Sequence, residues 1–97
     1  MSIAARMKTK IEAHLSPVLL KMADDSAKHA GHESLPEGMD ESHIGMLIVS
    51  EKFKGLSRVA RTRLVYDLLA EEIAQIHAVT ALKTLTPEEY AALNIAQ

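Results

Sequence analysis

The sequence predicts a single α+β domain in which a three-stranded sheet and its helices form two layers, an α/β sandwich. Three observations support this fold class. The chain has 97 residues, 47% hydrophobic and 25% charged, which suits one small apolar core. Apolar residues recur with helical spacing in some segments and form short runs or alternate in others. These segments follow one another as helix, strand, strand, helix, strand, helix. Residues 1–97 are therefore expected to form one domain.

An amphipathic helix is expected at the start of the chain, because apolar residues recur there at every fourth position. These positions are Ile3, Met7, Ile11 and Leu15. Ser2 is a suitable N-cap, and Pro17 ends the helix. The apolar run of residues 18–23 predicts a first strand. Residues 24–41 are polar and form a predicted long loop, and loops longer than about 12–15 residues are usually functional or disordered.

The clearest strand signal lies in residues 43–49, where two sets of side chains alternate. One set is Ile44, Met46 and Ile48, and the other is His43, Gly45, Leu47 and Val49. Because this strand follows the first directly, the two are expected to pair antiparallel.

A long helix is predicted next, capped by Ser57 after a turn at Gly55 and reaching about Gln75. Its expected apolar stripe is Leu64, Val65, Leu68, Leu69, Ile73 and Ile76. Residues 78–85 predict a third strand that joins the same sheet.

A short final helix is predicted from the sequence Thr86-Pro87-Glu88-Glu89. It combines an N-cap, proline at the first helical position and glutamate three residues after the cap. Tyr90 and Leu93 are expected to dock this helix on the rest of the domain.

The composition excludes several classes of protein. The chain contains no cysteine, which excludes a disulfide scaffold, a thiol nucleophile and an iron–sulfur cluster held by this chain alone. The net charge of −2 argues against a surface that is basic throughout. Neither a signal-peptide pattern nor an apolar run of about 20 residues is present, so we expect a cytoplasmic protein without a membrane partner.

The sequence does not predict an enzyme. It lacks a phosphate-binding glycine loop, a G-x-S-x-G elbow, an H-E-x-x-H motif and a pair of carboxylates in an apolar setting. The acid pairs at positions 24–25, 71–72 and 88–89 are interpreted as solvated charges. No catalytic residue is therefore assigned.

Histidine is enriched, with five residues in the chain. His29 and His32 lie three residues apart in the predicted loop, and His77 stands at the end of the long helix. Imidazole nitrogen suits zinc, copper and iron, so these three are candidate metal ligands. The alternative is that the loop histidines provide solubility and that His77 interacts with the helix dipole.

A basic cluster lies around the start of the long helix. Residues 52–63 contain no acid and hold five cations: Lys52, Lys54, Arg58, Arg61 and Arg63. Arginines at a helix N-terminus can hold a phosphate or the acidic surface of a partner. The alternative is an ordinary solvated helix face.

An ordered set of short stretches resembles the BolA family, from about residue 5 to residue 90. The stretches are Asp24-Asp25-Ser26, His29-Ala30-Gly31-His32, Glu41-Ser42-His43, residues 47–55 (LIVSEKFKG), residues 61–66 (RTRLVY), residues 69–73 (LAEEI), Ile76-His77-Ala78 and residues 85–89 (LTPEE). The resemblance implies a fold similar to the type II KH domain, with three strands and the helices on one side.

The same resemblance implies a partner and a cofactor. The partner is a monothiol glutaredoxin of the Cys-Gly-Phe-Ser type, with which family members are thought to share a [2Fe-2S] cluster together with glutathione. In this family the BolA-like protein supplies a histidine near its C-terminus, which corresponds to His77, and a loop ligand, which corresponds to His32 in preference to His29. Two histidines on one iron would give a Rieske-like site.

The resemblance has two departures and leaves one alternative function. Thr62 stands where the family commonly has histidine, and the Gly-x-x-Gly loop of nucleic-acid-binding KH domains is absent. Transcriptional roles have nevertheless been proposed for some family members. The alternative is therefore a DNA-binding regulator that uses the five cations of the basic cluster.

Overall fold

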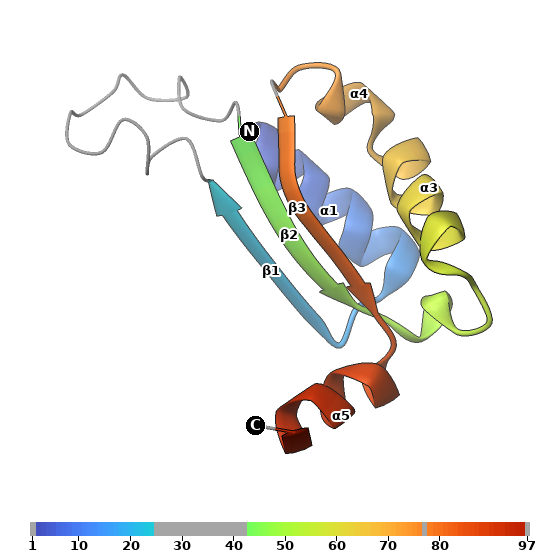
Figure 1. Cartoon of the computed structure of the whole chain (residues 1–97). Coiled ribbons are helices and arrows are strands. Elements are labelled where there is room, and N and C mark those ends of the chain that lie inside the picture. The colour runs from blue at the N-terminus through green and yellow to red at the C-terminus, as the bar shows by residue number, and fades with distance from the viewer. Residues whose placement is uncertain (1, 25–42, 77, 97) are drawn as a thin grey trace, which may run out of the picture.

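The helices and strands follow the predicted order in the computed structural model, which describes residues 2–24, 43–76 and 78–96 (Figure 1). The elements are α1 (Ile3–Leu15), β1 (Leu19–Asp24), β2 (His43–Val49), the short 3-10 helix η1 (Glu51–Phe53), α3 (Arg58–Leu68), α4 (Ala70–Ile73), β3 (Ala78–Leu85) and α5 (Pro87–Ala96). The predicted loop at 24–41 falls, apart from its first residue, outside the described residues.

The three strands form one mixed sheet in the order β1-β2-β3. β1 and β2 are antiparallel, as the sequence predicts for consecutive strands, and Asp24 pairs with Ile44. β3 lies parallel to β2, with His43 opposite Ala78, and the register shifts once between Ile44 and Gly45. The parallel pairing requires a crossover connection, which η1, α3 and α4 provide.

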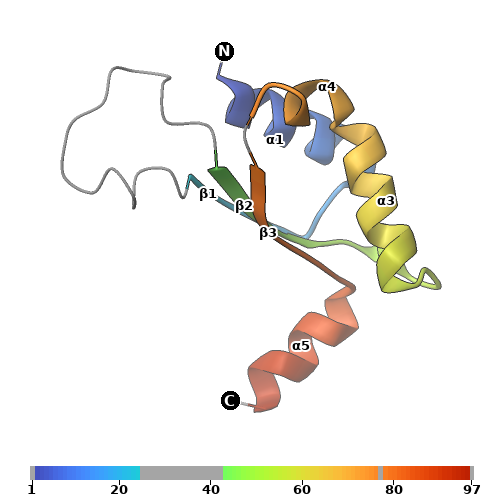
Figure 2. The ribbon, with the colours of Figure 1, turned by 45° about the horizontal axis from the view of Figure 1, so that its top comes forward.

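The helices α1, α3 and α4 cover one face of the sheet, whereas α5 lies on the other side at the far end of β3 (Figure 2). Met7 and Ile11 of α1 are fully buried against this face, as are Ile48 of β2 and Phe53 of η1. The alternation predicted for β2 is confirmed, because Ile44, Met46 and Ile48 all belong to the core. This arrangement is the predicted α+β sandwich, but the expectation that all helices lie on one side of the sheet is wrong, because α5 lies on the opposite side.

The predicted helix starts are also confirmed. The hydroxyl oxygen of Ser2 accepts a hydrogen bond from the Ala5 amide at 3.0 Å, and that of Ser57 accepts one from the Ala60 amide at 3.1 Å. These bonds satisfy amides that have no partner in the first turn of a helix. α1 ends at Leu15, before Ser16, which adopts a left-handed backbone conformation with φ 43°.

The long helix predicted from Ser57 to Gln75 is wrong in one respect, because it is broken at Leu69. This residue has φ −105° and ψ 19°, outside the helical range, and its side chain is fully buried. The change of direction separates α3 from α4. Leu64, placed in the apolar stripe by its spacing, is 37% exposed.

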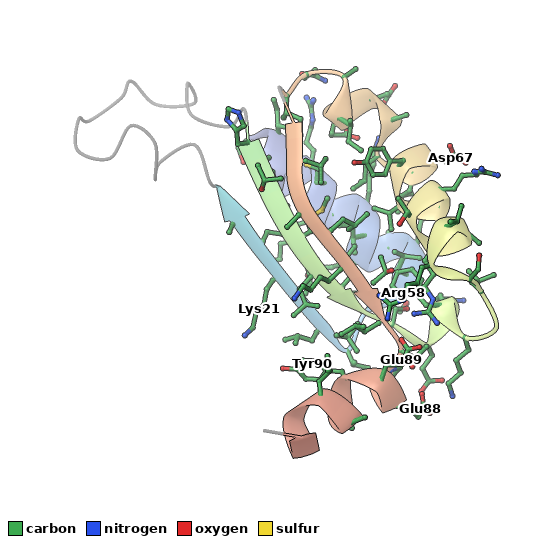
Figure 3. The ribbon with its side chains drawn as sticks, in the orientation of Figure 1. Lys21, Arg58, Asp67, Glu88, Glu89 and Tyr90 are labelled. Atoms are coloured by element: carbon green, nitrogen blue, oxygen red, sulfur yellow. The ribbon has the colours of Figure 1, made fainter. Side chains whose placement is uncertain are left out.

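Leu93, predicted to dock α5, is 51% exposed and lines a shallow hollow together with Leu82 and Leu85 of β3. Tyr90 is half-buried and lies on the side of α5 that is turned toward the strands (Figure 3). Within the described ranges, none of the helices has the length and apolarity that a membrane span requires.

Candidate functional site

The five cations of the basic cluster occupy different environments, although they are close in sequence. Lys52 lies in η1, Lys54 follows it, and Arg58, Arg61 and Arg63 lie on α3. Burial and ion pairing together separate them into one internal residue, one locally paired residue and three exposed residues without an ion pair to another described residue.

Arg61 is the internal residue, with 7% of its surface exposed. Its Nε donates to the carbonyl of Leu56 at 3.0 Å, and its Nη1 donates to the carbonyl of Thr84 at 3.0 Å. The guanidinium also donates to both carboxylate oxygens of Glu89, at 2.7 and 3.1 Å. It lies 5.9 Å from the centre of the Phe53 ring. Arg61 is therefore a structural residue, and the prediction that it belongs to a binding surface is wrong, because its guanidinium is bonded within the chain.

Glu89 receives the charge of Arg61 and also closes the predicted capping box of α5. Its carboxylate accepts from the Thr86 amide at 2.9 Å, and the Thr86 hydroxyl accepts from the Glu89 amide at 3.1 Å. The Arg61 guanidinium and then the Thr86 amide lower the pKa of Glu89 to about 2. The acid pair at 88–89 is thus more than a solvated helix start, because Glu89 fixes α5 to α3.

Lys54 is the locally paired residue. Its Nζ lies 3.1 Å from Glu88 and 3.9 Å from Glu51, and its side chain is half exposed. The hydrogen bond to Glu88 raises the pKa of Lys54. Its charge is therefore largely offset within the chain, which reduces its value for holding an external anion.

Three cations remain exposed, namely Lys52, Arg58 and Arg63. A shallow hollow of about 400 Å³ lies on α3 and is lined by Arg58, Val59, Thr62 and Arg63. We call these four residues the α3 surface. Val59, the apolar residue of the α3 surface, is 65% exposed. The α3 surface thus combines two guanidinium groups with an apolar side chain, which suits an acidic partner that also offers apolar contact.

The three candidate metal ligands, His29, His32 and His77, lie outside the described residues. Their described neighbours can nevertheless be located. Asp24, the first residue of the predicted loop, pairs with Ile44 near the start of β2. His43, which follows the loop, pairs with Ala78, which follows residue 77. The chain segments on both sides of these candidates therefore meet at one end of the sheet (Figure 1).

Within the ranges 2–24, 43–76 and 78–96, three or more histidine, aspartate or glutamate side chains do not gather in a group that could hold a metal ion. His14 is exposed on α1, and His43 is half-buried at the start of β2. The donor chemistry of the whole chain still suits a shared cluster, because imidazole nitrogen can ligate the iron of a Rieske-type centre while thiolates come from elsewhere. The absence of cysteine from the chain requires that division.

A second charged cluster, which the sequence interpretation missed, joins α1 to α4. Glu72 is only 2% exposed, and its carboxylate accepts from Lys10 Nζ at 2.9 Å and lies 3.7 Å from Arg6 Nε. Burial opposes its charge, but the bond from Lys10 and the other favourable interactions outweigh burial, so the pKa of Glu72 is lowered. Glu71 is solvated as expected, with 82% exposure.

The spacing of the apolar stripe could have identified Glu72. It stands three residues after Leu69 and four before Ile76, and both of these residues belong to the predicted stripe. A carboxylate on the buried face of a helix requires a cation nearby. The sequence alone could not show that Lys10, 62 residues earlier, provides it.

Comparison with known proteins gives consistent matches. Residues 11–89 match the sequence family described as BolA-like protein. The chain is 42% identical over 88 residues to Protein BOLA1, chloroplastic, of Arabidopsis thaliana, which covers 89% of this chain and 54% of that protein. It is 36% identical over 94 residues to the Escherichia coli protein named DNA-binding transcriptional regulator BolA, covering 97% and 85%. The chain therefore spans about half the length of the Arabidopsis relative.

A solved structure shows the same fold. The BolA domain of SufE1 from Arabidopsis thaliana superposes with a TM-score of 0.75 at 40% identity, over 92% of this chain and 96% of that one. This similarity over most of both chains confirms the predicted fold class.

Proposed function

Because this chain belongs to the BolA family, we propose that it is a non-catalytic partner of a monothiol glutaredoxin of the Cys-Gly-Phe-Ser type. In this proposal it contributes histidine ligands to a [2Fe-2S] cluster shared with that partner and with glutathione, in iron–sulfur cluster handling or iron and redox signalling. His77 is one ligand, and the second is His32, with His29 as the alternate. The cytoplasmic location expected from the sequence stays a prediction.

One observation carries this proposal. The strand register brings Asp24 and His43, which flank the segment that contains His29 and His32, and Ala78, which follows His77, to one end of the sheet. Two ligands that are more than 40 positions apart in sequence need such a meeting point in order to reach one iron. Histidine ligation would give the cluster a higher reduction potential than four cysteines would.

The exposed cations supply the docking surface in this proposal. Arg58 and Arg63 of the α3 surface, together with Lys52, would contact acidic groups of the glutaredoxin or the carboxylates of glutathione. Arg61 is excluded because its guanidinium is used inside the chain. Lys54 contributes less because Glu88 already pairs with it.

The test is to mix the chain with a cluster-loaded monothiol glutaredoxin and glutathione, and to follow size-exclusion chromatography and visible absorption. A heterodimer with an altered visible spectrum is expected. His77→Ala should abolish the spectral change, and His32→Ala should weaken it more than His29→Ala does. His14→Ala is the matched control, since His14 is exposed on α1. If the His77→Ala complex has the parent spectrum, the ligand assignment is wrong.

A second candidate function is DNA binding. It is favoured by the name of the Escherichia coli relative, DNA-binding transcriptional regulator BolA, and by the exposed cations Lys52, Arg58 and Arg63. It requires that the isolated chain bind duplex DNA with an affinity that falls steeply as salt is raised. Reversal of Arg58 and Arg63 to glutamate would then abolish binding. The absence of a glutaredoxin complex at micromolar concentrations, with such binding present, would favour this function over the first.

A further inference from the structure

The face of the sheet opposite α1, α3 and α4 presents residues in rows that cross all three strands. Met22, Met46 and Leu82 point toward the core, so their strand neighbours point to the opposite face. The register aligns these neighbours in two central rows. One row is Ala23, Gly45 and Ala81, and the next is Lys21, Leu47 and Lys83. We call these six residues the sheet surface.

The sheet surface is hollowed rather than flat. A depression of about 420 Å³ is lined by Lys21, Met22, Ala23, Gly45, Met46, Leu47 and Ala81. Its floor is low because the first row consists of two exposed alanines and a buried glycine, none of which has a side chain beyond Cβ. At the other end, α5 lies on the same side of the sheet and bounds the surface (Figure 2).

The charges of the sheet surface are all of one sign. Lys21 and Lys83 are exposed and lie on the two outer strands, on either side of Leu47. Because neighbouring strands are about 4.8 Å apart, the two lysine positions are separated by about 10 Å. Lys21 extends from β1 on the side away from α3 and α4 (Figure 3). Among the described residues, neither ammonium group has an ion-pair partner, and the six residues of the surface include no acid.

We propose that the sheet surface docks an amphipathic helix of a protein partner, one whose apolar stripe is flanked by carboxylates. The stripe lies over Leu47 and the row of small residues, which allow the helix to approach the sheet closely. The carboxylates on its two flanks pair with Lys21 and Lys83. The width of a helix with side chains, about 10–12 Å, matches the separation of the two lysine positions. This proposal is independent of the histidine ligands and of the α3 surface.

The charge pattern argues against two other occupants. A second copy of this chain, packed face to face, would place the Lys21 and Lys83 of both copies in one interface, and such like-charge contacts oppose association. Duplex DNA offers a dense row of phosphates, whereas this surface has two cations around an apolar centre and a row without polar side chains. An acidic, apolar helix satisfies both the lysines and the apolar centre.

The test uses two synthetic helical peptides of about 18 residues, about 27 Å long as helices. Both carry the same leucine stripe, flanked in one peptide by glutamates and in the other by lysines. Each is titrated into the ¹⁵N-labelled full-length chain. The glutamate peptide should shift the amide resonances of Gly45, Leu47 and Ala81 in a saturable manner, and the lysine peptide should not.

Charge reversal then tests the role of the lysines. Lys21→Glu and Lys83→Glu should each weaken binding of the glutamate peptide about tenfold, and the double variant should prefer the lysine peptide. Lys8→Glu is the matched control, because Lys8 is exposed on α1, on the other side of the sheet. It should leave the affinity unchanged. Lys21→Gln and Lys83→Gln should give intermediate affinities and keep the test valid if a reversal perturbs folding.

Four outcomes would overturn the proposal. The two peptides could bind equally well, which would remove the role of charge. The shifts could map to the α3 surface. The same amides could shift with protein concentration in the absence of peptide, which would identify a second copy as the occupant. Duplex DNA could shift them in place of the peptide.

Discussion

The guanidinium of Arg61 joins the start of α3 to β3 and α5, whose bonded residues lie 23 and 28 positions further along the chain. It bonds to the carbonyl of Leu56 before α3, to the carbonyl of Thr84 at the end of β3 and to the carboxylate of Glu89 in α5. β3 is an edge strand, and the bond to Thr84 uses one of its backbone acceptors. A single buried side chain thus holds the edge of the sheet and the start of α5 in place.

Replacement of Arg61 should therefore destabilise the fold. Arg61→Met keeps much of the side-chain volume but removes every one of these bonds. We expect the free energy of unfolding to fall by about 3 kcal/mol, because the hydrogen bonds donated by a buried charge are lost and their acceptors are left without a donor. Urea denaturation followed by circular dichroism measures the change. Arg63→Met, two residues further along α3 and exposed, should change it by less than about 0.5 kcal/mol. Equal effects of the two substitutions would contradict a structural role for Arg61.

At the scale of elements, α4 depends on its neighbours. It has four residues, which is too short for a helix to be stable on its own. Leu69 buries its side chain at the break between α3 and α4, and Glu72 bonds to Lys10 of α1. These two residues direct α4 onto α1, and the chain then continues toward the start of β3.

Loss of the Glu72 carboxylate should loosen α4 selectively. In Glu72→Ala, Lys10 loses its buried partner. We therefore expect the equilibrium constant for local opening of α4, and with it the amide exchange rates at residues 73–76, to rise by about tenfold. Exchange at Val65 in α3 should change much less. Hydrogen–deuterium exchange read by NMR measures both.

The neighbouring residue provides a matched control for this experiment. Glu71 also bonds to Lys10, at 3.1 Å, but is 82% exposed. Glu71→Ala should therefore have a clearly smaller effect on the same amides, because exposed ion pairs contribute little. If Glu71→Ala matched Glu72→Ala, burial of the carboxylate would not be the cause.

At the scale of the whole molecule, patterns among neighbouring residues in the sequence were sufficient to predict most helices and strands. Caps at Ser2, Ser57 and Thr86 and the alternation in β2 are properties of neighbouring residues, and each is confirmed. The helix break at Leu69 was not predictable, because its residues favour a helix locally and the break serves tertiary packing.

The site was less predictable than the fold, for the same reason. A count of cations in residues 52–63 cannot separate Arg61, which pairs with Glu89 28 positions away, from Arg58, which is exposed. The sheet surface was also invisible to local patterns, because its rows exist only once β1, β2 and β3 are in register. Pairings between distant segments decide which charges remain available to a partner.

The paired carboxylates make the stability of the whole molecule depend on pH in the acidic range. The pKa values of Glu72, Glu88 and Glu89 are all lowered in the folded chain. For Glu89 the pKa falls from 4.5 to about 2, chiefly because of Arg61. A group with a lowered folded pKa binds fewer protons in the folded state than in the unfolded state. Its contribution is therefore complete above pH 4.5 and is lost as the pH falls through about 2.

The free energy of unfolding should accordingly decline from pH 4.5 to pH 2, and part of that decline should belong to Glu89. Glu89→Gln should be less stable than the parent chain at pH 7, because the neutral amide removes the ion pair with Arg61 and keeps only one of the two acceptor oxygens. The difference between the two proteins should shrink as the pH falls, since protonation removes the same charge from the parent. Urea unfolding at a series of pH values measures both curves. A difference that stays constant down to pH 2 would mean that the Glu89 charge does not stabilise the fold, and that Arg61 acts through its carbonyl bonds alone.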